Sequence, residues 1–117
     1  MKTIIAGSRT ITDESVLRSA LSLVHWEITE VVCGMAPGID SLGADWAIDN
    51  NIPVSYYPAD WRKYGYAAGP IRNKEMAENA DALLLIWDGH SRGSKNMYQT
   101  WLTLKSKDSV VSVVTRG

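Results

Sequence analysis

Short apolar runs alternate with longer segments of helical spacing along the whole chain, and this alternation restricts the fold more than any other feature. The apolar runs cover residues 2–6, 30–33, 53–57, 82–87 and 109–114. The helical segments cover residues 13–23, 39–50, 70–79 and 92–106. Strands that alternate with helices of this length form parallel sheets with right-handed crossovers. We therefore predict an α/β fold with a doubly wound, mainly parallel five-stranded sheet and helices on both faces.

Length and charge narrow the class of protein further. The chain has 117 residues, of which 12 are Lys or Arg and 13 are Asp or Glu. This length suits a single domain over residues 1–117. The balanced charge argues against nucleic acid as a partner, since nonspecific binders are usually more basic. The apolar run at the N-terminus is too short for a signal peptide or a membrane span, so we expect a cytoplasmic protein without a membrane partner.

The cysteine and histidine residues give no sign of metal or redox chemistry. Cys33 is the single cysteine and lies in an apolar run, so the chain has no internal disulfide. We interpret it as a small buried hydrophobe, because nothing nearby in the sequence would activate its thiol. His25 and His90 are far apart and lack the spacing of metal ligands. We predict neither a bound metal nor a cofactor.

Three glycine-bearing loops follow predicted strands and lead into predicted helices. Because the carboxyl ends of parallel strands meet at one edge of a sheet, these loops and the helix N-termini should gather there. Backbone N–H groups at helix N-termini favour anionic groups such as phosphate. The residues that we expect to bind a ligand from these loops are Gly7, Ser8, Arg9, Gly34, Ala36, Gly38, Asp40, Ser41, Asp88, Gly89, Ser91, Arg92, Gly93 and Ser94.

Two residues of these loops leave a structural alternative open. Arg9 is suited to clamping an anion in its guanidinium fork, or it is a solvated side chain at a tight turn. Asp40 lies at or near the start of the helix over residues 39–50, where capping alone would explain it. Otherwise Asp40 holds the loop or accepts a hydrogen bond from a ribose hydroxyl.

The segment that begins at Gly69 adds further candidates. It places Arg72 and Asn73 in the first turns of a helix, where the positive end of the helix dipole makes an arginine unfavourable by a few tenths of a kcal/mol. This placement suggests anion binding, and the alternative is a surface arginine paired with Glu75 or Glu78. We add Gly69, Arg72 and Asn73 to the expected ligand-binding residues.

Aromatic side chains gather in residues 58–68, a segment too irregular to predict a helix. A base could stack on Trp61, Tyr64 or Tyr66, or these side chains could pack as a lid with no ligand. With five Trp and five Tyr in the chain, we also expect some of them to be buried in a homodimer or higher homo-oligomer.

Taken in order, these segments resemble the SLOG superfamily, and within it the small stand-alone YspA-type branch. SLOG proteins are Rossmann-like domains related to DNA-processing protein A and to the "lonely guy" phosphoribohydrolases. The resemblance spans nearly the whole chain and is carried by Gly7-Ser8-Arg9, Gly34-x-Ala36-x-Gly38-x-Asp40, Gly69-Pro70-x-Arg72-Asn73-x-x-Met76 and the glycine-rich loop 88–96. It implies that a nucleotide or nucleotide-derived small molecule binds at the carboxyl edge of the sheet.

The phosphoribohydrolases of this superfamily cleave an N-glycosidic bond with an arginine and a glutamate. Arg72 matches that arginine, but the glutamate position falls near Asn96, where no residue is acidic. The resemblance thus implies Arg72 and Asn96 as candidate catalytic residues, without the carboxylate that such a reaction uses. It favours a nucleotide sensor or sequestering protein, with an N-glycosidase as the alternative and single-stranded nucleic-acid binding as the third.

Overall fold

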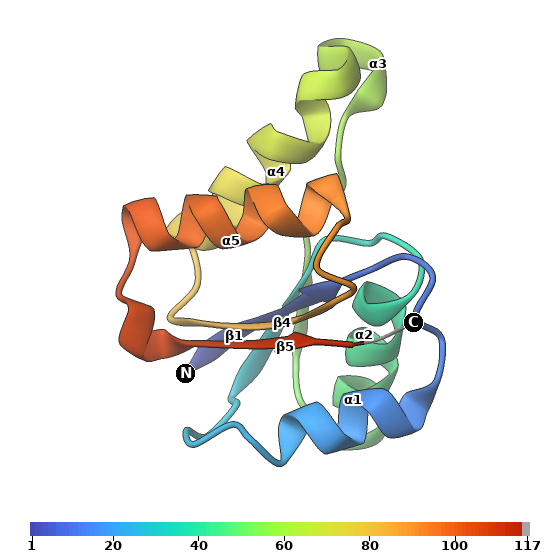
Figure 1. The fold of residues 1–117 in the computed structure, drawn as a ribbon, viewed down its shortest axis with the longest axis vertical. Coiled ribbons are helices and arrows are strands. Elements are labelled where there is room, and N and C mark those ends of the chain that lie inside the picture. Colours follow the sequence, from blue (N-terminus) through green and yellow to red (C-terminus); the bar gives the residue numbers. More distant parts are fainter. Residues whose placement is uncertain (116–117) are drawn as a thin grey trace.

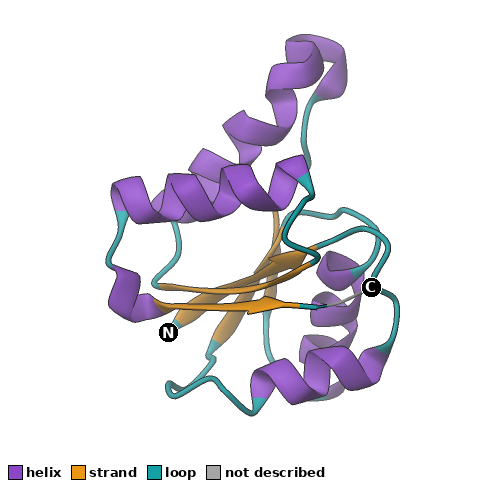
Figure 2. Ribbon diagram, in the orientation of Figure 1, coloured by secondary structure: helices purple, strands orange, loops and turns teal. Residues whose placement is uncertain are grey.

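The computed structural model describes residues 1–115, and its centre is a five-stranded sheet. All strands run parallel, in the order β3-β2-β1-β4-β5. Figure 2 shows them as a twisted layer between helices. The strands are β1 (Lys2–Gly7), β2 (Glu30–Cys33), β3 (Val54–Tyr56), β4 (Ala82–Trp87) and β5 (Val110–Val114). The predicted Rossmann-like α/β fold is confirmed, and the sheet is wholly rather than mainly parallel.

Helices cover both faces of the sheet, as expected for a doubly wound fold (Figure 1). The helices and 3-10 turns are α1 (Glu14–Leu21), α2 (Ile39–Asp49), α3 (Trp61–Tyr64), η1 (Gly65–Ala67), α4 (Ala68–Glu78), α5 (Arg92–Leu104) and η2 (Lys107–Ser109). α1 and α2 lie on one face, and α4 and α5 lie on the other. α4 begins two residues before Pro70, so that this proline lies in the first turn, where its missing N–H has no cost.

β4 supplies much of the core because its side chains alternate between two covered faces. All six of its residues are buried. Leu83 and Leu85 pack with Met76 of α4 and Trp101 of α5, whereas Leu84 packs on the face covered by α1 and α2. Each fully buried leucine contributes about 1.5–3 kcal/mol to stability. The uniformly apolar sequence of this strand therefore explains why it lies inside the sheet and not at an edge.

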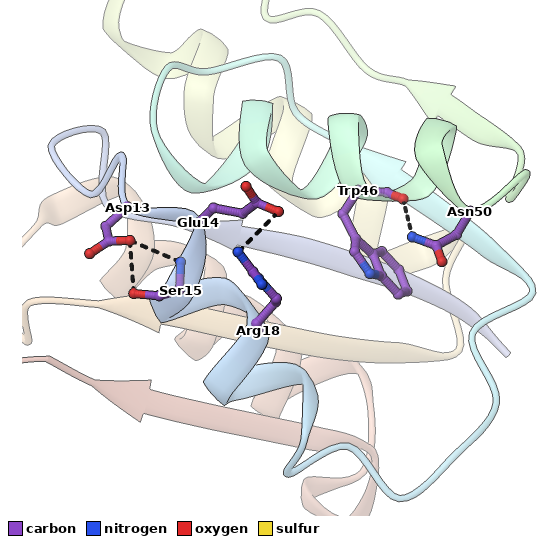
Figure 3. A network of polar contacts seen from close by, with 6 residues as sticks. All are labelled: Asp13, Glu14, Ser15, Arg18, Trp46 and Asn50. Atoms are coloured by element: carbon purple, nitrogen blue, oxygen red, sulfur yellow. Dashed lines mark hydrogen bonds and ion pairs between the residues drawn. The ribbon is translucent and has the colours of Figure 1, made fainter.

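The N-terminus of α1 shows how short polar motifs fix the helix boundaries (Figure 3). Asp13 is the N-cap and accepts hydrogen bonds from the Ser15 N–H at 2.9 Å and the Ser15 hydroxyl at 2.8 Å. One turn further on, Arg18 lies 3.6 Å from Glu14. Both side chains of this ion pair are largely exposed, so it contributes little to stability.

The aromatic connection between β3 and α4 differs from the expectation. The sequence predicts no helix over residues 58–68, yet α3 and η1 form there. Asp60 caps α3 by accepting a hydrogen bond from the Lys63 N–H at 3.1 Å. A helix of one turn has no apolar periodicity to reveal it, which is why the sequence pattern misses it. In Figure 1 this segment projects beyond α5, away from the sheet.

The order of the strands reverses next to β1. The chain moves outward from β1 through β2 to β3, and then returns to place β4 on the other side of β1. Such a reversal leaves a crevice at the carboxyl ends of the two strands, where open α/β sheets bind ligands. The loops that follow β1, β2 and β4 gather at this edge, on the right of Figure 1.

Candidate functional site

A cleft of about 290 Å³ opens at the carboxyl ends of β1 and β4. The loops after these strands line it, together with the starts of α2 and α5 and the middle of α4. The expected ligand-binding residues that the structure brings together along the cleft are Gly7, Ser8, Arg9, Ala36, Asp40, Arg72, Asn73, Asp88, Ser91, Arg92, Gly93 and Ser94. They come from four separate segments of the chain, and the topology of the sheet makes them neighbours.

The other expected residues do not line this cleft. They are Gly34, Gly38, Ser41, Gly69, Gly89 and Asn96. Ser41 donates a hydrogen bond to the Ala36 carbonyl at 3.1 Å and so supports the loop before α2. The Asn96 carboxamide oxygen accepts a hydrogen bond from the Asn73 side chain at 3.0 Å. Asn96 therefore supports a cleft residue, and its catalytic role stays a prediction.

Four residues that are not among the expected ligand-binding residues complete the lining: Ala6, Thr10, Met76 and Met97. Met76 and Met97 are each 1% exposed and belong to the core beneath α4 and α5, so they give the cleft an apolar floor. Met76 follows Arg72 by four residues and shares its helix face, which is a signal that could have identified it. The sequence around Met97 shows no comparable spacing from an expected ligand-binding residue.

Ser8 joins the loops at the base of the cleft. Its hydroxyl accepts a hydrogen bond from the Asp88 N–H at 3.1 Å and lies 3.3 Å from the Ser91 hydroxyl. Its carbonyl accepts a hydrogen bond from the Ile39 N–H at 3.3 Å. Because Ser8 is 2% exposed, these bonds form in a site shielded from water. The residue fixes the loops after β1 and β4 relative to α2.

Asp88 shapes the loop that leads into α5. Its Oδ1 accepts hydrogen bonds from the N–H groups of His90 and Ser91, both at 2.8 Å, and these bonds lower the pKa of the carboxyl below its ordinary value. Ser91 is the N-cap of α5, and within the described chain its side chain makes no capping hydrogen bond. The first N–H groups of a helix have no acceptor inside it, so this N-terminus can receive an anion.

Arg72 is a half-buried arginine that connects two loops. Its Nη1 donates to the Gly34 carbonyl, and its Nε donates to the Asn73 side-chain oxygen at 3.0 Å. Asn73, which is 4% exposed, donates in turn to the Gly93 carbonyl at 3.3 Å. Among residues 1–115, no ion pair joins Arg72 to either glutamate of α4. The expected alternative of a surface pair is therefore wrong, and the guanidinium is held at the cleft.

Asp40 closes the loop between β2 and α2. Gly38 is the N-cap of α2 and Asp40 is its second residue, so Asp40 is not the capping residue. Its side chain is 4% exposed, and its Oδ2 accepts a hydrogen bond from the Ala36 N–H at 3.3 Å. Burial raises the pKa of Asp40 to about 6, although this hydrogen bond and the charge of Arg72 act in the opposite direction.

The rim of the cleft is positively charged, although the chain as a whole is nearly neutral. Arg9 and Arg92 are exposed on this rim, and Arg72 lies half-buried beside them. Asp40 and Asp88 offset this charge only in part, because two carboxyls face three guanidinium groups in the cleft. An anion that enters the cleft meets three guanidinium groups, which suit the geometry of phosphate oxygens.

Cys33 is buried, as predicted, and burial raises the pKa of its thiol. In the part of the chain that the structure describes, no three His, Cys, Asp or Glu side chains are grouped so that they could hold a metal ion. Within the same residues, no helix combines the length and the apolar character that crossing a membrane requires.

The buried carboxyl of Asp40 predicts an unusual dependence of stability on pH. Its pKa is about 6 in the folded protein and about 3.9 in an unfolded chain, so the folded state binds the proton more tightly. The stability that the protonated carboxyl provides is fully present below about pH 4 and is lost as the pH rises through about 6. We define a difference in stability as the free energy of unfolding of Asp40→Asn minus that of the parent. This difference should increase by about 2 kcal/mol between pH 4 and pH 7.

Urea unfolding at several pH values measures this difference. Asp13→Asn is the matched control, because hydrogen bonds to Ser15 lower the pKa of Asp13 and its stabilisation is therefore lost as the pH falls. As the pH rises, the free energy of unfolding should increase relative to the parent for Asp40→Asn and decrease relative to the parent for Asp13→Asn. A difference for Asp40→Asn that stays constant from pH 4 to pH 7 would contradict the raised pKa.

Comparison with models of protein families matches residues 1–64 to YAcAr, described as the YspA, cpYpsA-related SLOG family. The match covers more than half of the chain and includes the loops after β1 and β2. Comparisons with curated proteins and with solved structures find no match. The family match ends before α4 and α5, the two helices that contribute Arg72 and Arg92 to the cleft.

Proposed function

The chain belongs to the YspA, cpYpsA-related SLOG family, and on this premise we propose that it binds a small molecule carrying phosphate and ribose, as a sensor or a sequestering protein. One observation carries the proposal. Three arginines and the N-terminus of α5 surround a cleft of about 290 Å³ at the point where the strand order reverses. This volume is close to the lower end of the range for small-molecule sites.

The phosphate is assigned to the N-terminus of α5. There the first N–H groups of the helix, the buried Ser94 side chain and the Arg92 guanidinium lie at the cleft. Helix N-termini bind phosphate through such N–H groups, and the helix dipole adds to the attraction. The ribose is assigned to the carboxylate of Asp88, whose Oδ1 accepts both loop hydrogen bonds and leaves Oδ2 for a sugar hydroxyl.

Calorimetric titration of the full chain against nucleoside monophosphates, ADP-ribose, NAD and cyclic nucleotides tests the proposal. At least one of these compounds should bind, and it should raise the midpoint of thermal unfolding according to its concentration and affinity. Binding should weaken with added salt, because the phosphate contacts are electrostatic. A natively folded protein that binds no member of the panel would refute the proposed function.

Arg92→Ala should weaken nucleotide binding without loss of stability. Arg92 is exposed in the first turn of α5, where the helix dipole disfavours a positive charge by a few tenths of a kcal/mol. Its removal should lower the affinity by about tenfold, the effect of losing one charge-assisted hydrogen bond, and leave the unfolding midpoint unchanged or slightly higher. Arg18→Ala is the control, since Arg18 pairs with Glu14 in α1, outside the cleft. Equal effects of the two variants on affinity would show that only net charge matters.

A second candidate is an N-glycosidase that acts on a nucleoside monophosphate. The observation in its favour is the carboxyl of Asp40, which lines the same cleft as Arg72 and has a pKa of about 6. Such a carboxyl could stabilise an oxocarbenium-like transition state or transfer a proton to the departing base. Chromatography of AMP or CMP after incubation with the protein would detect free base. Release of base that Asp40→Asn abolishes would favour this candidate.

A further inference from the structure

A second cleft, of about 310 Å³, adjoins the first. The two clefts share Arg9, Ala36 and Arg72. Apart from these residues and Gly34, the second cleft is lined by Met35, Pro37, Pro58, Ala59 and Trp61. It therefore has guanidinium groups at the shared end and apolar side chains elsewhere. A ligand whose anionic part lies in the first cleft has room for an apolar, planar part in the second.

Trp61 is the large aromatic side chain of this second cleft. It is the first residue of α3 and is 50% exposed. The indole lies against Gly69, in the first turn of α4, since a Cβ built on this glycine would be in van der Waals contact, at 3.4 Å, with the Trp61 ring atom Cη2. The ring thus rests against the start of α4 and remains partly in water. A planar ring that stacks on it would bury this apolar surface.

Met35 provides a second exposed apolar side chain in the same cleft. It is 54% exposed, and its backbone has a φ of 63°, in the left-handed region that residues other than glycine seldom adopt. Its N–H donates to the Cys33 sulfur at 3.3 Å, which helps to hold this conformation. Strained residues held in this way are concentrated at ligand sites. The methionine sulfur and methyl group are also favourable contacts for an aromatic ring.

We propose that the second cleft is a nucleobase subsite, in which the base stacks on Trp61 while the phosphate and ribose occupy the first cleft. The inference rests on the proposed function, since it assigns the remaining part of the same ligand. The nearly neutral charge of the chain favours a free nucleotide over a nucleic-acid strand as the source of the base.

Titration calorimetry with AMP and with ribose 5-phosphate tests the subsite, because the two compounds share the phosphate and the sugar and differ by the base. Trp61→Ala should weaken AMP binding by about 5- to 100-fold, the range measured for the loss of one aromatic stacking partner. Ribose 5-phosphate should bind the variant and the parent equally. Trp61→Phe keeps an aromatic ring and should retain most of the affinity for AMP. Tyr66→Ala is the control, because Tyr66 lies on the same segment, is 99% exposed and lines neither cleft.

The possible outcomes separate the subsite from the proposed function. If Trp61→Ala changes the affinity for both compounds equally, or for neither, the subsite is refuted and the proposed function stands. If the parent protein binds neither compound nor any other nucleotide, both proposals are refuted. A 5′-phosphorylated oligonucleotide that binds more tightly than AMP would assign the stacked base to a strand end and overturn the assignment to a free nucleotide.

Discussion

Gly38→Ala is expected to lower the free energy of unfolding by about 3–5 kcal/mol, as the combined effect of backbone strain and overpacking. Gly38 has a φ of 79° and a ψ of −128°, a conformation that is strained for any residue with a Cβ. A Cβ on this residue would also lie 2.3 Å from the Ser8 carbonyl oxygen and 2.6 Å from that of Arg9. Both contacts are with backbone atoms, which cannot move aside by changing a rotamer.

Two other glycines separate the contributions of strain and contact in urea unfolding of the same chain. Gly65 has a φ of 55° and Gly93 lies in the first turn of α5; in the described residues, nothing lies within 4 Å of a Cβ built on either glycine. Gly65 has a ψ of −133°, so its backbone conformation is close to that of Gly38. Gly65→Ala should therefore show only the strain, about 1–3 kcal/mol, and Gly93→Ala should be neutral or slightly stabilising. If Gly38→Ala lowers the free energy of unfolding by no more than Gly65→Ala does, the loops after β1 and β2 do not pack against each other in the way that these distances require.

The fold could be predicted because its determinants are local. The helical spacing of apolar residues and the uniformly apolar β4 are visible in short stretches of sequence, and parallel strands connected by helices leave little choice of architecture. α3 was missed because a single turn is stabilised by one cap, at Asp60, and shows no period. The expected single domain, homo-oligomer and cytoplasmic location stay predictions.

From the sequence, the cleft could be predicted only as a set of loops that meet at the carboxyl edge of the sheet. The sequence does not show that Arg72 reaches the Gly34 carbonyl, or that Asn73 bonds to Asn96, because these contacts join residues far apart in the chain. For the same reason Asp40 resembles a helix cap in the sequence. Its role as the residue that closes the loop depends on the Ala36 N–H, whose direction is set by the tertiary structure.

Arg72→Ala should reduce nucleotide binding by about 100-fold, because a hydrogen-bonded charge in a partly buried site contributes about 2–5 kcal/mol to affinity. The free energy of unfolding should fall by less, about 1–2 kcal/mol, because removal of the guanidinium leaves the Gly34 carbonyl without this donor and takes a positive charge away from the buried Asp40. Relief of the repulsion from Arg9 offsets this loss only in part. Calorimetry with AMP measures the first effect, and urea unfolding measures the second. Lys74→Ala is the control on the same helix, since Lys74 is exposed and lies outside both clefts.

Arg72→Lys separates charge from geometry. The lysine keeps the positive charge but loses the planar fork that donates to the Gly34 carbonyl and to Asn73 at the same time. We therefore expect Arg72→Lys to recover only part of the affinity, because the remaining charge attracts the phosphate but no longer holds the loop after β2 and the Asn73 side chain in place. Full recovery would mean that the cleft recognises only charge. An affinity unchanged in Arg72→Ala would place the anion elsewhere and remove the basis for a nucleotide site between β1 and β4.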